Sequence, residues 1–283
     1  MPIYDLGYRH WKGKLLSADY RWWAITRAGV LMLARRRNFI VLLLLSLIPF
    51  IIRGVMLYAY FFSQQLHIRI PFLQLDGKFY FDFLSWQLFW VFIMLLYAGS
   101  GLVANDLRSN ALQIYFSKPI GRTDYLLGKL GILCSFILLV TLVPGLLLFL
   151  LHMIFAGDSA AFQQHAWIAG AIIGYSILLA GVNGLLMLAF SSLSRNSRFA
   201  GLVFFALYFF SESVYGLLRV ISRDTSMAFC SLKNNYLRIG EAFFGMTSQY
   251  NMPVWPSILV LSGLMVLSLL LLFRQIRPVE VVK

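Results

Sequence analysis

Six long apolar stretches run along the chain, and short polar or charged segments separate them. A transmembrane helix needs about 20 mostly apolar residues to cross a hydrocarbon core ~30 Å thick. The stretches that meet this length are residues 39–62, 83–104, 125–151, 166–190, 199–218 and 255–273. The pattern therefore predicts an all-α membrane protein with six transmembrane helices.

A different, amphipathic pattern precedes the first of these stretches, in residues 18–37. Trp22, Ile25, Gly29 and Leu33 fall on one stripe at helical spacing, and Arg21, Arg27 and Arg35 fall on the other side. Trp22 is followed by Trp23, and this composition predicts a helix lying in the membrane interface. The alternative is a plain basic flank to the first span.

Composition also favours lipid as the solvent of most of the chain. Sixty per cent of the residues are hydrophobic and 12% are charged, whereas a soluble domain carries roughly 25% charged residues. The net charge of +13 would suggest nucleic-acid binding in a soluble protein. Basic residues beside membrane spans instead set topology and bind the headgroups of membrane lipids, so no nucleic-acid partner is expected.

The distribution of basic residues predicts the orientation. If the N-terminus is inside, 17 of the 24 Lys and Arg residues lie in cytoplasmic segments and six lie in outer loops. This excess predicts a plasma (inner) membrane protein with both termini in the cytoplasm. The predicted regions are a cytoplasmic N-terminus (1–38), a transmembrane domain (39–273) and a cytoplasmic tail (274–283). The outer loop 219–254 fits the rule least, because it carries four of the six outer charges.

That outer loop has a helical pattern of its own. Asn234 or Asn235 can cap a short helix that ends at Gly245, with Tyr236, Ile239, Phe243 and Phe244 on one side. We expect a helix lying on the outer leaflet. The alternative is a re-entrant element that partly closes an exit route.

The inner loop 105–129 is the longest cytoplasmic segment between predicted spans. Its first half predicts a short helix with Leu112, Tyr115 and Phe116 on one side. Pro119 then ends the helix, because proline lacks a backbone donor and restricts the residue before it. A short helix held between two spans suits docking to a partner and transmission of a rigid-body displacement.

The same loop resembles the signature loop of ABC-2 type transporter permeases. The family pattern is an acidic-basic pair, a small helix, a Ser-basic-Pro-hydrophobic turn, a basic residue, an aromatic residue and Gly-Lys. The matching residues here are Asp106, Arg108, Leu112, Phe116-Ser117-Lys118-Pro119-Ile120-Gly121-Arg122, Tyr125 and Gly128-Lys129. The six-span plan, the N-terminal helix and the outer helix are also similar. This chain has Ser109-Asn110-Ala111 where many members have Gly-Thr.

The resemblance implies the transmembrane permease subunit of an ATP-driven exporter. Such permeases pair as dimers, with an identical chain or a paralogue, and dock on two copies of a cytoplasmic ATP-hydrolysing subunit. The implied coupling residues are Asp106, Arg108, Leu112, Tyr115, Phe116, Lys118, Pro119 and Arg122. The interfacial helix, with Trp22, Trp23, Arg27 and Arg35, would contribute to the same contact.

The resemblance leaves catalysis to the partner. No G-x-x-x-x-G-K-[ST] sequence is present, so we expect ATP and Mg²⁺ in the partner subunit, and no catalytic, cofactor or metal site in this chain. By analogy, the first, second and fifth spans would line the substrate cavity. The apolar, aromatic spans favour a hydrophobic or amphipathic substrate.

Arg53 and Glu212 stand out because they lie deep within the predicted spans, where charge is costly and is often functional. Arg53 and Glu212 both lie ~20 Å from the inner boundary of their helices at ~1.5 Å per residue. We expect them to form an ion pair in the outer half of the bundle. The alternative places Arg53 among outer headgroups and Glu212 beside a wet vestibule.

Two other classes of function remain open at this point. A membrane-embedded transferase acting on a lipid would need clustered carboxylates or histidines, but the 11 acidic residues are scattered and form no D-x-x-D. An ATP-independent carrier would be favoured by inverted repeats, and none is convincing here.

Overall fold

The computed structural model describes residues 20–66, 75–157 and 159–276, and this part of the chain is helical, with no strand. The predicted segments before Tyr20 and after Ile276 lie outside the described residues. The elements in chain order are α1 (Arg21–Ala34), α2 (Arg37–Leu45), α3 (Ile48–Gln65), α4 (Gly77–Met94), the π-helix η2 (Leu95–Gly99), α5 (Ala104–Arg108), α6 (Ala111–Phe116), α7 (Arg122–Ala156), α8 (Ser159–Ser192), α9 (Ser197–Ser222), the 3₁₀-helix η3 (Ser226–Cys230), α10 (Leu232–Phe243) and α11 (Trp255–Gln275).

Within the described residues, six helical stretches are long and apolar enough to cross a membrane, which confirms the predicted number. They are Arg37–Gln65, Gly77–Arg108, Arg122–Ala156, His165–Ser192, Ser197–Ser222 and Trp255–Gln275. The first comprises α2 and α3, and the second comprises α4, η2 and α5. The second starts six residues earlier than predicted, at Gly77, because its first turns are aromatic but interrupted by Lys78 and Asp82.

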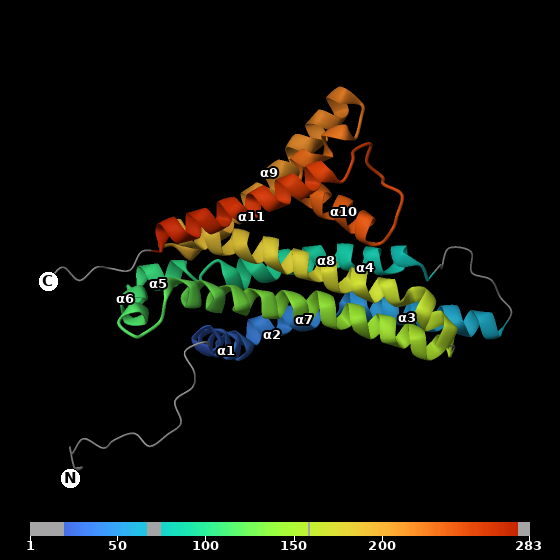
Figure 1. Ribbon diagram of the computed structural model, residues 1–283, viewed down its shortest axis with the longest axis horizontal. Coiled ribbons are helices and arrows are strands. Elements are labelled where there is room, and N and C mark those ends of the chain that lie inside the picture. Colours follow the sequence, from blue (N-terminus) through green and yellow to red (C-terminus); the bar gives the residue numbers. More distant parts are fainter. Residues whose placement is uncertain (1–19, 67–74, 158, 277–283) are drawn as a thin grey trace, which may run out of the picture.

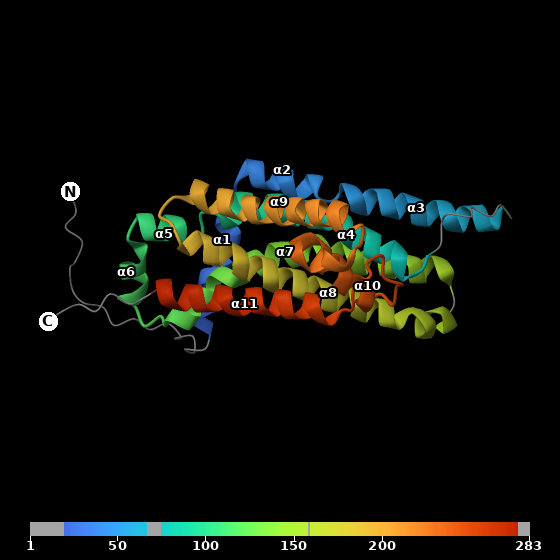
Figure 2. The same ribbon diagram turned by 90° about the horizontal axis from the view of Figure 1, so that it is seen from above.

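The long helices lie roughly along one axis, with α7 and α8 side by side in the middle (Figures 1 and 2). Helices α3 and α4 pack on α7, and α11 packs on α8. Helix α9 leaves this group at an angle (Figure 1). Large buried side chains such as Tyr80, Phe83 and Tyr175 fill the centre, and the Tyr80 hydroxyl hydrogen-bonds with Nδ1 of His152 at 2.8 Å.

Helix α1 packs across α7 at the end of the bundle where α5 and α6 lie (Figures 1 and 2). The two backbones approach closely at Gly128, where a Cβ atom would lie 2.7 Å from the Cβ of Ile25. Thr26 Oγ1 donates to the carbonyl of Gly128 at 3.0 Å. Only a small residue permits this approach, so glycine sets the contact.

The predicted helix before the first span is therefore present, and its apolar stripe has a protein partner. Ile25 and Leu33 are buried, since this stripe packs on α7. The opposite side carries Trp23, Arg27 and Arg35, which are exposed. Its position in the membrane interface stays a prediction.

Candidate functional site

The second span is not a continuous α-helix near its end, where residues 104–129 begin; these residues contain the predicted coupling residues and are called the coupling segment below. After α4 the chain forms η2, turns through residues 100–103 and resumes as α5. Ser191 of α8 bridges the break, because its Oγ accepts from the backbone N–H groups of Val103 (3.1 Å) and Ala104 (3.0 Å) and donates to the carbonyl of Ser100 at 2.8 Å. A side chain thus replaces hydrogen bonds that a regular helix would make.

The coupling segment itself contains two short helices rather than the single predicted one. Asn110 separates α5 from α6 and has a φ of 53°. This left-handed conformation, which asparagine tolerates better than most residues, stops the first helix and redirects the chain. Leu112 of α6 is buried against the core, and Tyr115 and Phe116 are half-buried beside it.

A buried polar cluster fixes the coupling segment to α7. Lys129 Nζ lies 2.6 Å from Oδ2 of Asp106, and the Tyr125 hydroxyl donates to the same oxygen at 2.8 Å. The Lys129 ammonium also lies 5.7 Å from the ring centroid of Tyr115 and 5.5 Å from that of Tyr125. Burial, and then the Asp106 carboxylate, raise the pKa of the Tyr115 phenol.

The other side of the coupling segment is exposed and basic. Arg108, Lys118, Pro119 and Arg122 are exposed, and Arg21 of α1 donates to the carbonyl of Pro119. The turn is closed by Asp124, whose Oδ2 accepts from the backbone N–H of Gly121 at 3.0 Å. The eight predicted coupling residues thus divide into an inner set that anchors the segment (Asp106, Leu112, Tyr115, Phe116) and an outer set that is exposed (Arg108, Lys118, Pro119, Arg122).

The predicted ion pair between Arg53 and Glu212 is wrong. Arg53 Nη2 lies 3.5 Å from Oδ2 of Asp82, and its guanidinium carbon lies 5.0 Å and 5.5 Å from the ring centroids of Phe79 and Trp86. Helix α4 begins before Asp82, so this carboxylate faces α3 within the span instead of lying in a loop.

Glu212 has a different partner, on the segment that follows α9. Its Oε2 accepts a hydrogen bond from the hydroxyl of Ser231 at 2.5 Å. Ser231 Oγ also accepts from the backbone N–H of Asn234 at 3.2 Å and so caps α10. Asn234 and Asn235 therefore lie inside the helix that they were expected to cap.

Helix α10 is inserted between the spans, not laid on the outer surface as predicted. It packs on α4, α8, α9 and α11, and Asn235, Tyr236 and Glu241 are buried. The re-entrant alternative describes it better. The sequence predicts one apolar side for this helix, but Asn235 and Glu241, which lie outside that side, are buried as well because they have polar partners.

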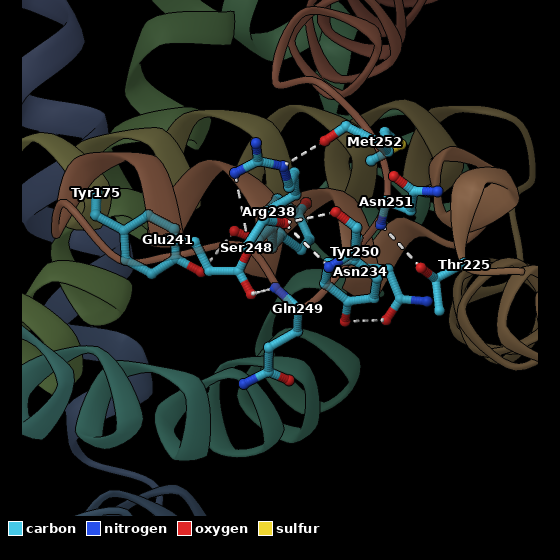
Figure 3. Close-up of polar contacts among 11 residues, drawn as sticks. Tyr175, Thr225, Asn234, Arg238, Glu241, Ser248, Gln249, Tyr250, Asn251 and Met252 are labelled. Carbon is cyan, nitrogen blue, oxygen red and sulfur yellow. Dashed lines mark hydrogen bonds and ion pairs between the residues drawn. The ribbon is translucent and has the colours of Figure 1, made fainter.

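These polar side chains hold the following loop, residues 245–254, over α10 (Figure 3). Glu241 Oε1 accepts from the backbone N–H of Gln249 at 3.3 Å. Arg238 Nε donates to the carbonyl of Met252 at 2.9 Å, and the Tyr250 hydroxyl donates to Oδ1 of Asn234 at 3.0 Å. The loop is thereby fixed at three points to a single buried helix.

An aromatic groove of about 490 Å³ lies in the membrane-spanning region between α3, α4 and α9. Pro49 lines it from α3, Trp86, Phe89 and Phe92 line it from α4, and Tyr208 lines it from α9. Lys233 of α10 is also part of its wall. Helices α3, α4 and α9 belong to the first, second and fifth spans.

In the part of the chain that the structure describes, no three His, Cys, Asp or Glu side chains lie close enough to hold a metal ion. The fold and the site together define a polytopic helical membrane protein with a structured loop anchored to its central helix. A family model described as ABC-2 family transporter protein matches residues 23–273. The chain therefore belongs to this family, and it is a transmembrane permease, the membrane component of a transporter. No curated protein matches the chain.

Proposed function

We propose that this permease is the membrane subunit of an ATP-driven exporter and that one copy of a separate ATP-hydrolysing subunit docks on its coupling segment, so that a dimer of permeases carries two copies. The observation that carries the proposal is the two-sided construction of this segment. Its outer side presents Arg108, Lys118 and Arg122 to solvent. Its inner side joins α7 through the ion pair of Asp106 and Lys129.

This construction would transmit a displacement of the short helix α6 to the long helices that it contacts. Helix α6 is only six residues long, and its buried Leu112 leaves it little freedom to move alone. Displacement of the partner would therefore move α5, α6 and the start of α7 together. Helix α1 would follow, because Arg21 and Thr26 bond to the same region.

The aromatic groove supports a hydrophobic or amphipathic substrate. Its walls are mainly large apolar rings with a few polar groups, the composition typical of sites for small organic ligands. A second permease, identical or paralogous, would face the same side and complete the cavity. The apolar surface of α9 there includes Phe205, Phe209 and Phe210, all at least half exposed.

The outer end of this path would be closed by α10 and the loop 245–254. The three contacts in Figure 3 hold the loop in one position. Export would require at least some of them to break while the substrate leaves. The orientation follows the basic residues, which places the coupling segment and both termini in the cytoplasm and the chain in the plasma membrane.

Co-purification with the ATPase subunit tests the proposal. The candidate partner is a Walker-A protein encoded beside this chain. The double charge reversal Lys118→Glu/Arg122→Glu should abolish the complex, since it inverts the exposed face without touching a buried contact. Arg219→Glu is the control for an exposed charge reversal elsewhere, because Arg219 is also exposed but lies at the opposite end of α9 from Ser197.

Retention of the complex in the Lys118→Glu/Arg122→Glu variant would overturn the docking site. Transport by the purified chain alone, without ATP and without the partner, would instead favour the carrier alternative. Either result would contradict the proposal that ATP hydrolysis in the partner acts on the permease through the coupling segment.

A further inference from the structure

A crevice of about 520 Å³ lies between α1 and the broken part of the second span. It is separate from the aromatic groove, since none of its lining residues belongs to that groove. Its floor includes Lys129 and Ile132 of α7 and Tyr115 of α6. The crevice thus adjoins the cluster that anchors the coupling segment.

One wall is formed by α1 and the residues directly after it. Arg21, Ala24, Ala28 and Met32 of α1 line it beside the stripe that packs on α7, and Arg36 continues the wall beyond the end of the helix. The two alanines in the middle leave the crevice open, and a basic residue stands at each end. Met32 is 62% exposed at the lip, which gives the crevice an apolar margin.

The opposite wall is the irregular backbone of η2 and the turn after it. Tyr97, Ala98, Gly101 and Leu102 line this side. A π-helix is rare and often marks a functional position. Here it places Tyr97, which is 37% exposed, opposite α1, so both sides of the opening are apolar.

The charged side chains of the crevice differ in whether they already have a partner within the protein. Asp106 is its single lining acid, and Lys129 already neutralises it. Arg21 is engaged with the Pro119 carbonyl. Arg36 is exposed and has no ion-pair partner among the described residues, and exposed Arg35 and Arg37 flank it.

We propose that this crevice binds an anionic phospholipid from the surrounding bilayer, with the phosphate held at Arg36 and an acyl chain between Met32 and Tyr97. The surplus positive charge selects the anionic headgroup, and the apolar lips match a hydrocarbon chain. The volume has room for a headgroup and part of a chain, so the remainder of the lipid stays in the bilayer. This inference rests on the membrane-embedded fold and does not depend on the ATPase partner.

Lipid retention measured by native mass spectrometry tests the charge requirement. The purified full chain is exchanged into detergent micelles that contain either phosphatidylglycerol or phosphatidylcholine. Loss of a charge-assisted hydrogen bond should make Arg36→Gln bind phosphatidylglycerol roughly tenfold more weakly than the unmodified chain. Arg27→Gln, an exposed change on the same helix outside the crevice, should bind as the unmodified chain does.

A second pair of variants tests the acyl-chain requirement. Ala28→Phe fills the crevice from α1 and should remove retention of phosphatidylglycerol, while Ala34→Phe places the same ring on an exposed position outside it and should leave retention unchanged. Equal phosphatidylglycerol binding in Arg36→Gln and the unmodified chain would overturn the site. An equal loss in Arg27→Gln and Arg36→Gln would overturn it too, because it would show a diffuse charge effect.

Discussion

Lys129 Nζ lies 2.6 Å from Oδ2 of Asp106, and both side chains are largely buried at the base of the coupling segment. The carboxylate belongs to the end of the second span and the ammonium to the first turns of α7. The ion pair therefore links the end of the second span directly to the third span, in addition to the loop that connects them. The contact makes the coupling segment a closed structural unit.

Removal of one partner from this pair should be costly. We expect Asp106→Asn to lower the free energy of unfolding by about 3–5 kcal/mol, because it leaves the Lys129 ammonium buried without an anion. Thermal unfolding of the detergent-solubilised protein measures the change. Asp76→Asn, which alters an exposed carboxylate at the other end of the span, should have little effect.

The double variant Asp106→Asn/Lys129→Met separates stability from coupling. It should recover much of the lost stability, because no buried charge remains unpaired. It should not recover partner-dependent transport, since the link between the coupling segment and α7 is still absent. Full recovery of transport would contradict the role of this pair.

The partner of Arg53 can be determined by double-mutant cycles. Arg53→Gln and Asp82→Asn should be coupled by about 0.5–1 kcal/mol, a modest value because the Asp82 side chain is 37% exposed. Arg53→Gln and Glu212→Gln should be additive, as expected for side chains that share no contact. A larger coupling with Glu212 than with Asp82 would refute the observed pairing.

The bridge across the break in the second span can be tested at adjacent serines. Ser191→Ala should cost about 1–3 kcal/mol, because it leaves the buried N–H groups of Val103 and Ala104 without an acceptor. Ser192 is also buried, but its hydroxyl donates only to the Ala189 carbonyl in its own helix. Ser192→Ala should therefore cost much less.

Hydrogen exchange locates the effect of the serine variants. Ser191→Ala should accelerate exchange in residues 100–108, and Ser192→Ala should not. If both variants accelerate exchange equally, the bridge is not what holds the break.

The loop over α10 should depend on Glu241. Glu241→Ala removes the acceptor for the Gln249 N–H, and we expect faster hydrogen exchange in residues 246–252. Gln249→Ala is the matched control, because it removes an exposed side chain and leaves the bonded backbone N–H in place. Unchanged exchange in Glu241→Ala would mean that Arg238 and Tyr250 hold the loop without it.

The sequence predicts the spans well, because hydrophobic length alone defines them. It also predicts how far along a span a residue lies, and Arg53 and Glu212 do lie inside spans. The predicted ion pair was wrong because depth does not specify which side of a helix a residue occupies. Asp82 falls one residue before the predicted second span (83–104), because the charges near the start of α4 interrupt an otherwise aromatic run.

The coupling segment was recognisable from its motif, but its internal construction was not. A π-helix in a uniformly apolar run leaves no periodic signal, so η2 and the role of Ser191 were missed. The division at Asn110 was also missed, although asparagine is one of the few residues that favour a positive φ. Helix α10 was misplaced because a polar helical face predicts exposure unless the polar partners are known.

Helix α7 contains 35 residues and is about 50 Å long. It is fastened to the second span near both ends, through Asp106 to Lys129 and through Tyr80 to His152. The break at η2 lies between these two fastenings. The second span is therefore pinned in register against its neighbour, so it can change shape at the break but cannot slide along α7.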